Sequence, residues 1–378
     1  MKKILFVIPE YSHGGTNKSL ENLLALIDHN RYDISVYCLY EDGGDYYKKV
    51  FAPYVLRKSR LYYWLHDNVV TRKFMGLYYK LTKRNVGEWL YQREVRYLQK
   101  RKSYDVVVAY QEGTATQFVS YFKKCKKIAW NHSPYVRFTT VKSKRTAISL
   151  YNEFDHVVCV SRCFAKLFCE ALPSLANKVL TIYNAIDNDM TTLMGQTPLK
   201  ENVFDISCFS IVSIGRFCPQ KQFECIPDIA KELICLHGET CFKWYIIASG
   251  DECREKTEEK IKSYHLEDRV ILLGARDNPY PYIKQSDLVV CTSESESFSY
   301  VIAEAKVLHT PVLSNDFPVA YEVVDEQMGW IANIKDMPLV LARIIGNVDG
   351  EYDRKKRSCA DFRYDNREIL QKIELCLK

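Results

Sequence analysis

Two glutamates eight positions apart, Glu296 and Glu304, are the side chains of this sequence best placed to bind a polar ligand. The apolar run 287–291 before them predicts a short buried strand, and the run 301–308 predicts a helix. Ligands of open α/β sheets bind beyond the carboxyl ends of strands, and a helix start offers N–H donors to phosphate. Two carboxylates there would repel phosphate, so we expect them on hydroxyl groups. The pattern predicts a ligand with both phosphate and sugar, although such glutamates also occur simply as complements of the helix dipole.

Two cations follow the first strand expected in the second half of the chain. Arg216 and Lys221 bracket a turn whose backbone is partly fixed by Pro219. The guanidinium fork and the point charge of the ammonium suit a diphosphate. The alternative is an ordinary pair of solvated surface cations.

Polar and glycine residues also follow strands expected in the first half. Gly14 and Gly15 come after the first strand, where the absence of Cβ atoms allows close approach to a phosphate or merely a flexible turn. His132 follows a strand on the same expected edge, either as a ligand contact or as a structural histidine. Asn184 ends the last strand of this half, where capping of the strand end is favoured over a ligand contact.

The order of the expected elements predicts an α/β protein of two domains. Of the 378 residues, 47% are hydrophobic and 26% charged, which is typical of a globular protein. Strands and helices alternate in both halves, so we expect two doubly wound, Rossmann-like sheets facing each other across a cleft. The expected boundaries are 1–190, an irregular linker at 191–207, a second domain at 208–360, and a final helix at 361–378 that returns to the first domain.

Cysteine usage and the lack of long apolar runs predict a cytoplasmic protein. The first apolar stretch has only five residues before Pro9, which is short for a signal peptide, and no run approaches the length of a membrane span. The fourteen cysteines form no C-x-x-C pair and lack the Cys/His spacing of a zinc site. We therefore expect reduced thiols and no zinc site of this kind.

A basic, aromatic segment at 57–102 interrupts the first half. It contains thirteen Lys or Arg and three acidic residues. Its aromatic residues are Tyr62, Tyr63, Trp64, Phe74, Tyr78, Tyr79, Trp89, Tyr91 and Tyr97. This mixture suits the headgroup zone of an anionic membrane, or else a pair of amphipathic helices with an apolar face in the core and a solvated basic face. Nucleic-acid binding is not expected, because no such motif accompanies the charge.

Taken in order, these motifs resemble glycosyltransferase family 4, whose members are retaining enzymes of the GT-B fold. The resemblance rests on Gly14 and Gly15, on His132, on the run from Asn184 to Asp187, on the turn from Gly215 and Arg216 to Lys221, and on Glu296 with Glu304. The run from His265 to Gly274 is also similar to the family. The resemblance covers nearly the whole chain outside 41–102.

The resemblance implies a role for each matched position. Arg216 and Lys221 would hold the donor diphosphate and stabilise the leaving nucleotide, while Glu296 and His132 would contact the donor sugar. The other implied donor-binding residues are Glu304 on the ribose hydroxyls, Gly14 and Gly15 at the phosphates, the backbone around Ser299, Tyr300 and Val301, and also Gly274 and Asn184.

The resemblance also implies an activity. It points to a metal-independent, retaining hexosyltransferase (EC 2.4) that needs no cofactor and moves sugar from a nucleotide-sugar, a UDP-sugar by family frequency, to a saccharide or lipid-linked glycan in surface polysaccharide synthesis. It would lie in the cytoplasm or on the inner membrane face. Serines at 297 and 299 and Ala185 stand where the family usually has glycine. A nucleotide-sugar epimerase of the same fold and a non-catalytic partner subunit are the alternative functions.

Overall fold

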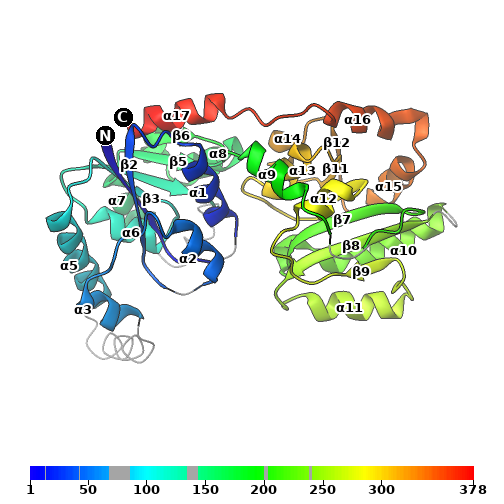
Figure 1. Ribbon diagram of the computed structural model, residues 1–378, viewed down its shortest axis with the longest axis horizontal. Helices are drawn as coiled ribbons and strands as arrows, with labels where there is room; N and C mark the ends of the chain where they lie inside the picture. The colour runs from blue at the N-terminus through cyan, green and yellow to red at the C-terminus, as the bar shows by residue number, and fades with distance from the viewer. Residues whose placement is uncertain (13, 42, 68–85, 134–143, 200–202, 238–240) are drawn as a thin grey trace. The chain divides into compact units, whose positions relative to one another are not determined.

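The computed structural model describes the chain except residues 13, 42, 68–85, 134–143, 200–202 and 238–240 (Figure 1). The described residues form two compact units. Unit 1 comprises Met1–Ala185 and Asn366–Lys378, and unit 2 comprises Ile186–Asp365. Each unit contains one six-stranded sheet whose neighbouring strands are all parallel. This confirms the predicted α/β class with two doubly wound sheets.

The sheet of unit 1 has the strand order β2-β1-β3-β4-β5-β6. Its strands are β1 (Lys2–Ile8), β2 (Tyr32–Cys38), β3 (Val106–Ala109), β4 (Lys126–Asn131), β5 (His156–Cys159) and β6 (Val179–Thr181). All four residues of β3 are buried, as expected for a central parallel strand covered on both faces. The run of consecutive valines is what made this strand predictable.

Except for the last, the described α-helices of unit 1 lie between these strands along the chain. They are α1 (Gly15–Leu26), α2 (Asp45–Phe51), α3 (Arg60–Tyr62), α5 (Val86–Arg101), α6 (Thr114–Ser120), α7 (Lys144–Asn152), α8 (Arg162–Ala171) and the C-terminal α17 (Arg367–Leu377). Helix α17, at the end of the chain, belongs to unit 1 (Figure 1). Glu374 of this helix forms a 2.7 Å ion pair with Arg31.

Part of the basic, aromatic segment belongs to the core of unit 1. Tyr62 and Tyr91 are buried and pack against the ring of Phe118 in α6. The buried carboxylate of Glu94 in α5 accepts hydrogen bonds from the Tyr37 hydroxyl and the Ser59 amide, each at 2.9 Å. Tyr63, Trp64 and Trp89 are exposed, and Tyr97 is half-buried. Phe74, Tyr78 and Tyr79 lie outside the described residues.

The sheet of unit 2 has the strand order β12-β11-β10-β7-β8-β9. Its strands are β7 (Phe209–Arg216), β8 (Phe242–Ser249), β9 (Val270–Leu272), β10 (Leu288–Cys291), β11 (Val312–Asn315) and β12 (Gly329–Ala332). Its helices are α9 (Asn188–Gly195), α10 (Ile226–His237), α11 (Arg254–Ser263), α12 (Tyr280–Gln285), α13 (Tyr300–Val307), α14 (Ala320–Val323), α15 (Met337–Ile345) and α16 (Glu351–Cys359). Buried Trp244, Leu233 and Leu341 belong to its main core cluster.

The stretch expected to be irregular contains a helix. Helix α9 covers residues 188–195, and its first turn is capped by Asp187, whose carboxylate accepts from the Met190 amide at 3.0 Å. Gly195 packs so closely that a Cβ there would lie 2.5 Å from the side chain of Leu308, the residue directly after α13. Eight residues are too few for a clear helical period, which explains why the sequence pattern missed α9.

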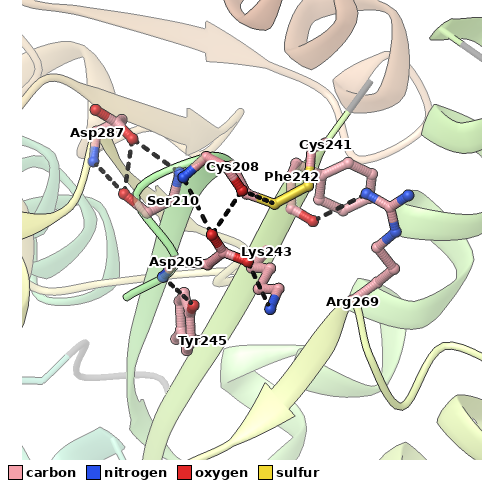
Figure 2. The surroundings of a disulfide bond; sticks show 10 residues. Asp205, Cys208, Ser210, Cys241, Phe242, Lys243, Tyr245, Arg269 and Asp287 are labelled. Carbon is pink, nitrogen blue, oxygen red and sulfur yellow. Dashed lines mark hydrogen bonds and ion pairs between the residues drawn. A yellow bond between two sulfur atoms is a disulfide. The ribbon is translucent and has the colours of Figure 1, made fainter. Parts of the chain in front are cut away.

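The expectation that all cysteines are free thiols is wrong for one pair. Cys208 and Cys241 form a disulfide with a Cα–Cα distance of 4.6 Å, directly before β7 and β8 (Figure 2). Phe209 faces Phe242 in the parallel register, so the preceding residues are brought opposite each other. The separation of 33 residues gave no signal of this pairing in the sequence.

Candidate functional site

The predicted cations and acids of unit 2 lie at the point where its strand order reverses. The chain leaves β7 for β8 on one side of the sheet and later returns to β10 on the other side of β7. The connections that follow β7 and β10 therefore diverge at their carboxyl ends. Such a topological switch point is where doubly wound sheets bind ligands.

Lys221 and Glu296 meet at this switch point. The Lys221 ammonium lies 2.6 Å from Oε1 of Glu296, and the Ser293 hydroxyl donates to the same oxygen at 2.8 Å. Both side chains are mostly buried, with 18% and 11% of their surfaces exposed. Burial lowers the pKa of Lys221, but the attraction of Glu296 and its hydrogen bond outweigh burial, so the net pKa is raised. The ammonium is therefore charged at neutral pH.

The two loops that carry this pair are tied to each other. The Thr292 hydroxyl donates to the Lys221 carbonyl at 2.7 Å, and the Glu294 amide donates to the Gln220 carbonyl at 2.8 Å. A Cβ on Gly215 would lie 3.0 Å from Cε of Lys221, so glycine leaves room for the lysine side chain over the end of β7. These contacts fix the position of the cation relative to the sheet.

The start of α13 is strained and polar. Ser299 precedes the helix in the left-handed region, with φ of 64°, which costs a residue with a Cβ about 1 kcal/mol. Its hydroxyl oxygen is buried and has no hydrogen-bond partner in the described part of the chain. Tyr300 and Val301 form the first turn, whose N–H groups are natural donors to an anion. The serine therefore occupies the conformation for which the family usually has glycine.

The remaining predicted residues of unit 2 occupy different surroundings. Glu304 is buried in α13 and accepts a 2.8 Å hydrogen bond from the Tyr280 hydroxyl of α12. Arg216 is exposed at the end of β7, and its side chain has no hydrogen bond or ion pair among the described residues. Gly274, after β9, has φ of 71° and open space where a Cβ would stand. Lys221 and Glu296 are thus brought into direct contact, whereas Glu304 is held by another helix.

Unit 1 has its own switch point, between β1 and β3. Gly14 and Gly15 lie after β1 at the start of α1, and neither has positive φ in the left-handed region. The Ser19 hydroxyl of α1 donates to Oδ1 of Asn184 at 2.7 Å and lies 2.8 Å from the Tyr110 hydroxyl. Asn184 is therefore bonded to the helix that follows the glycine loop, which agrees with a structural role.

His132 is buried at the end of β4, with 6% of its surface exposed. Burial lowers its pKa to about 3, so the ring is neutral at physiological pH. Its centroid lies 5.0 Å from the Tyr110 ring, and Nε2 has no hydrogen-bond partner among the described residues. The His132 amide donates to Oε2 of Glu112 at 2.7 Å. A neutral imidazole can bind a hydroxyl but supplies no charge.

Sequence reasoning missed several partners of the predicted residues. Ser293, Tyr280, Tyr110 and Glu112 each touch a predicted residue, yet they lie in loops or on elements with no recognisable motif. The available signal was their position directly after strands β10 and β3, or on the short α12.

No metal cluster or membrane span emerges from the residues the structure describes. No group of three or more His, Cys, Asp or Glu side chains there is arranged to hold a metal ion. Within the same residues, no helix is both long and apolar enough to cross a bilayer.

Comparison with protein families decides the assignment. The model "Glycosyltransferase Family 4" matches residues 13–190, and "Glycosyl transferases group 1" matches residues 208–348. The chain belongs to glycosyltransferase family 4. The family matches confirm the resemblance drawn from the motifs.

Two bacterial proteins illustrate the similarity of this family 4 chain to known proteins. The amylovoran biosynthesis glycosyltransferase AmsD of Erwinia amylovora is 23% identical over 94% of this chain and 92% of its own length. An uncharacterised 41.2 kDa protein in the cps region of Klebsiella pneumoniae is 24% identical over 62% of this chain. The chain spans 61% of the length of that protein and 41% of two other curated relatives.

A solved structure confirms the fold of this family 4 chain. Anabaena HepE, whose crystal structure is described as a complex with UDP and glucose, superposes with a TM-score of 0.73. The match covers 100% of this chain and 99% of HepE at 18% sequence identity. The family 4 chain therefore has the predicted GT-B fold.

Proposed function

We propose that this chain is a metal-independent, retaining glycosyltransferase. It moves a sugar from a UDP-sugar to a lipid-linked saccharide acceptor in surface polysaccharide synthesis. The observation that carries the proposal is the Lys221–Glu296 pair, held at the switch point of unit 2 beside the start of α13. The donor is supported by HepE, which was solved in complex with UDP and glucose, and the pathway class by AmsD, which is named for amylovoran biosynthesis.

The charges at the switch point suit departure of a nucleoside diphosphate. Lys221 has two N–H donors left after its bond to Glu296, and these bind the diphosphate together with Arg216 and the first N–H groups of α13. As the bond between the sugar carbon and the phosphate oxygen breaks, these donors stabilise the negative charge that develops on the leaving oxygen.

The acids and the neutral histidine are assigned to hydroxyl groups. Glu304, already bonded to Tyr280, accepts the ribose hydroxyls, and the second oxygen of Glu296 accepts a hydroxyl of the donor sugar. His132 contacts the sugar near its reacting carbon. The acceptor hydroxyl attacks from the face that the phosphate leaves, and the departing phosphate takes its proton, so configuration is retained.

A transfer assay tests this function. The purified protein is incubated with labelled UDP-glucose, UDP-galactose or UDP-N-acetylglucosamine and with polyprenyl diphosphate N-acetylglucosamine as acceptor. We expect labelled lipid product from at least one donor and its loss in Lys221→Met. Isomerised donor without transfer would identify an epimerase instead. Absence of both reactions with every donor would contradict catalysis and favour a partner subunit.

We also propose that the protein works on the cytoplasmic membrane face through the basic, aromatic segment. Tyr63, Trp64 and Trp89 are exposed there, and Arg93 lies 5.7 Å from the centroid of the Trp89 ring. Exposed indole and phenol rings among cations suit anionic headgroups. Trp64→Ser should weaken co-sedimentation with vesicles containing phosphatidylglycerol, whereas Tyr321→Ser, at an exposed ring of unit 2, should not. Equal binding by both variants would contradict this membrane contact.

A further inference from the structure

A buried carboxylate of unit 1, Glu112, has no part in the assignments above. It lies in the loop after β3, the strand to which the chain returns on the other side of β1. Glu296 lies at the corresponding place in unit 2, in the loop after β10, which pairs with β7. Loops at such places bind ligands in doubly wound sheets. The position of Glu112 is therefore one at which a ligand contact is expected.

The two oxygens of Glu112 have different surroundings. Oε2 accepts the His132 amide at 2.7 Å. Oε1 is buried and accepts no hydrogen bond from any described residue. The whole residue is 5% exposed. Oε2 therefore fixes the backbone at His132, while Oε1 can still accept hydrogen bonds from a ligand.

An unpaired buried acceptor is unfavourable unless something else binds it. Leaving such a group unsatisfied costs on the order of 1–3 kcal/mol, and native proteins keep few of them outside functional sites. Here a second unpaired buried atom, Nε2 of His132, belongs to the residue whose amide Glu112 holds. Two such atoms on residues joined by a hydrogen bond are suited to a ligand that is rich in hydroxyl groups.

We propose that Glu112 is a further substrate-binding residue: its Oε2 positions His132, and its Oε1 accepts a hydroxyl group of a sugar substrate. The inference rests on the proposed function. The hydroxyl belongs either to the donor sugar or to the acceptor saccharide, since both offer the same chemistry. Binding by this carboxylate selects sugars that carry a hydroxyl at one position and rejects those that lack it.

The variant Glu112→Gln tests the proposal with little change in shape. Its amide oxygen still accepts the His132 amide, but its NH₂ group replaces the acceptor at Oε1 with a donor. Glu94→Gln is a matched control, because Glu94 is also a buried, hydrogen-bonded carboxylate of unit 1 but holds Ser59 and Tyr37 instead. Thermal denaturation of both variants reports the purely structural cost of losing a buried carboxylate.

Steady-state kinetics then measure kcat and KM for the UDP-sugar and for polyprenyl diphosphate N-acetylglucosamine separately. We expect Glu112→Gln to lower kcat/KM for one substrate at least roughly tenfold relative to Glu94→Gln, and calorimetric affinity for UDP to stay within about twofold. A raised donor KM assigns the hydroxyl to the donor, and a raised acceptor KM assigns it to the acceptor. If Glu112→Gln does not fold, Glu112→Asp, which keeps the charge but shortens the reach, provides the same comparison.

Two failures are distinguishable. If the wild-type protein transfers sugar but Glu112→Gln matches Glu94→Gln within about twofold for both substrates, then Oε1 binds only water and this inference is overturned. If the wild-type protein transfers sugar from none of the UDP-sugars, the proposed function itself fails.

Discussion

Replacing Lys221 by methionine keeps an unbranched side chain as far as the ε position and removes the charged ammonium group. The variant loses the ammonium that lies 2.6 Å from Glu296, and with it a donor proposed to stabilise the leaving diphosphate. Removing one preorganised donor to developing negative charge costs about 10²–10³ in kcat, or roughly 3–4 kcal/mol. We therefore expect kcat/KM to fall by about 10²-fold or more.

The structural cost of the same change is smaller. The pair is mostly but not fully buried, and Glu296 keeps its hydrogen bond from Ser293. Loss of the ion pair should lower the free energy of unfolding by about 1–2 kcal/mol, between the values for surface and fully buried pairs. In a unit of this size that lowers the melting temperature by about 2–8 °C.

A double-mutant cycle separates the two effects. Lys221→Met, Glu296→Gln and the double variant are compared by thermal denaturation and by steady-state transfer kinetics. We expect the double variant to regain stability relative to Lys221→Met but not to regain kcat. Lys243→Met is the matched control, because Lys243 pairs with Asp205 at 3.1 Å beside the disulfide. A loss of kcat/KM below about threefold in Lys221→Met would show that Lys221 does not stabilise the leaving diphosphate.

Three further outcomes are expected. The pKa of His132 is lowered to about 3 in the folded protein, so as the pH falls below about 6.5 this side chain takes up a proton only in the unfolded chain. Between about pH 7 and 5.5, the free energy of unfolding of the wild type, measured with denaturant, should therefore fall by about 1 kcal/mol, and this loss should be missing from His132→Gln. Gly215→Ala should displace Lys221, whose Cε lies 3.0 Å from the new Cβ, and lower kcat/KM by about tenfold, and unchanged kinetics would contradict this. Reduction of the Cys208–Cys241 disulfide removes a cross-link across 33 residues worth about 3–4 kcal/mol, so a reductant should lower the melting temperature of the wild type and leave that of Cys208→Ser unchanged.

Most of the fold follows from local patterns in the sequence. The consecutive valines of β3 and the apolar run of β10 indicate buried parallel strands, and the alternation with helices leads to two doubly wound sheets. The pattern failed at α9, which is short and depends on the Asp187 cap and on packing of Gly195 against Leu308. β12 and α15, late in unit 2, were not anticipated either, because a strand of four residues and a helix of nine are too short for a clear hydrophobic period.

The candidate site was only partly predictable, since residue types do not reveal contacts between distant loops. The motifs singled out Lys221 and Glu296 separately, but the 2.6 Å ion pair depends on the register between β7 and β10. Likewise, Tyr280 and Glu112 belong to no motif. Their hydrogen bonds, from Tyr280 to Glu304 and from the His132 amide to Glu112, exist only in the folded chain. The disulfide was hidden for the same reason, because it depends on the pairing of β7 with β8.

The most direct test of the central claim is a crystal structure of the protein with UDP. We predict the diphosphate within hydrogen-bond distance of the Lys221 ammonium and of the N–H groups at the start of α13, with the ribose hydroxyls on Glu304. A diphosphate bound elsewhere, with the ammonium still directed only at Glu296, would contradict it.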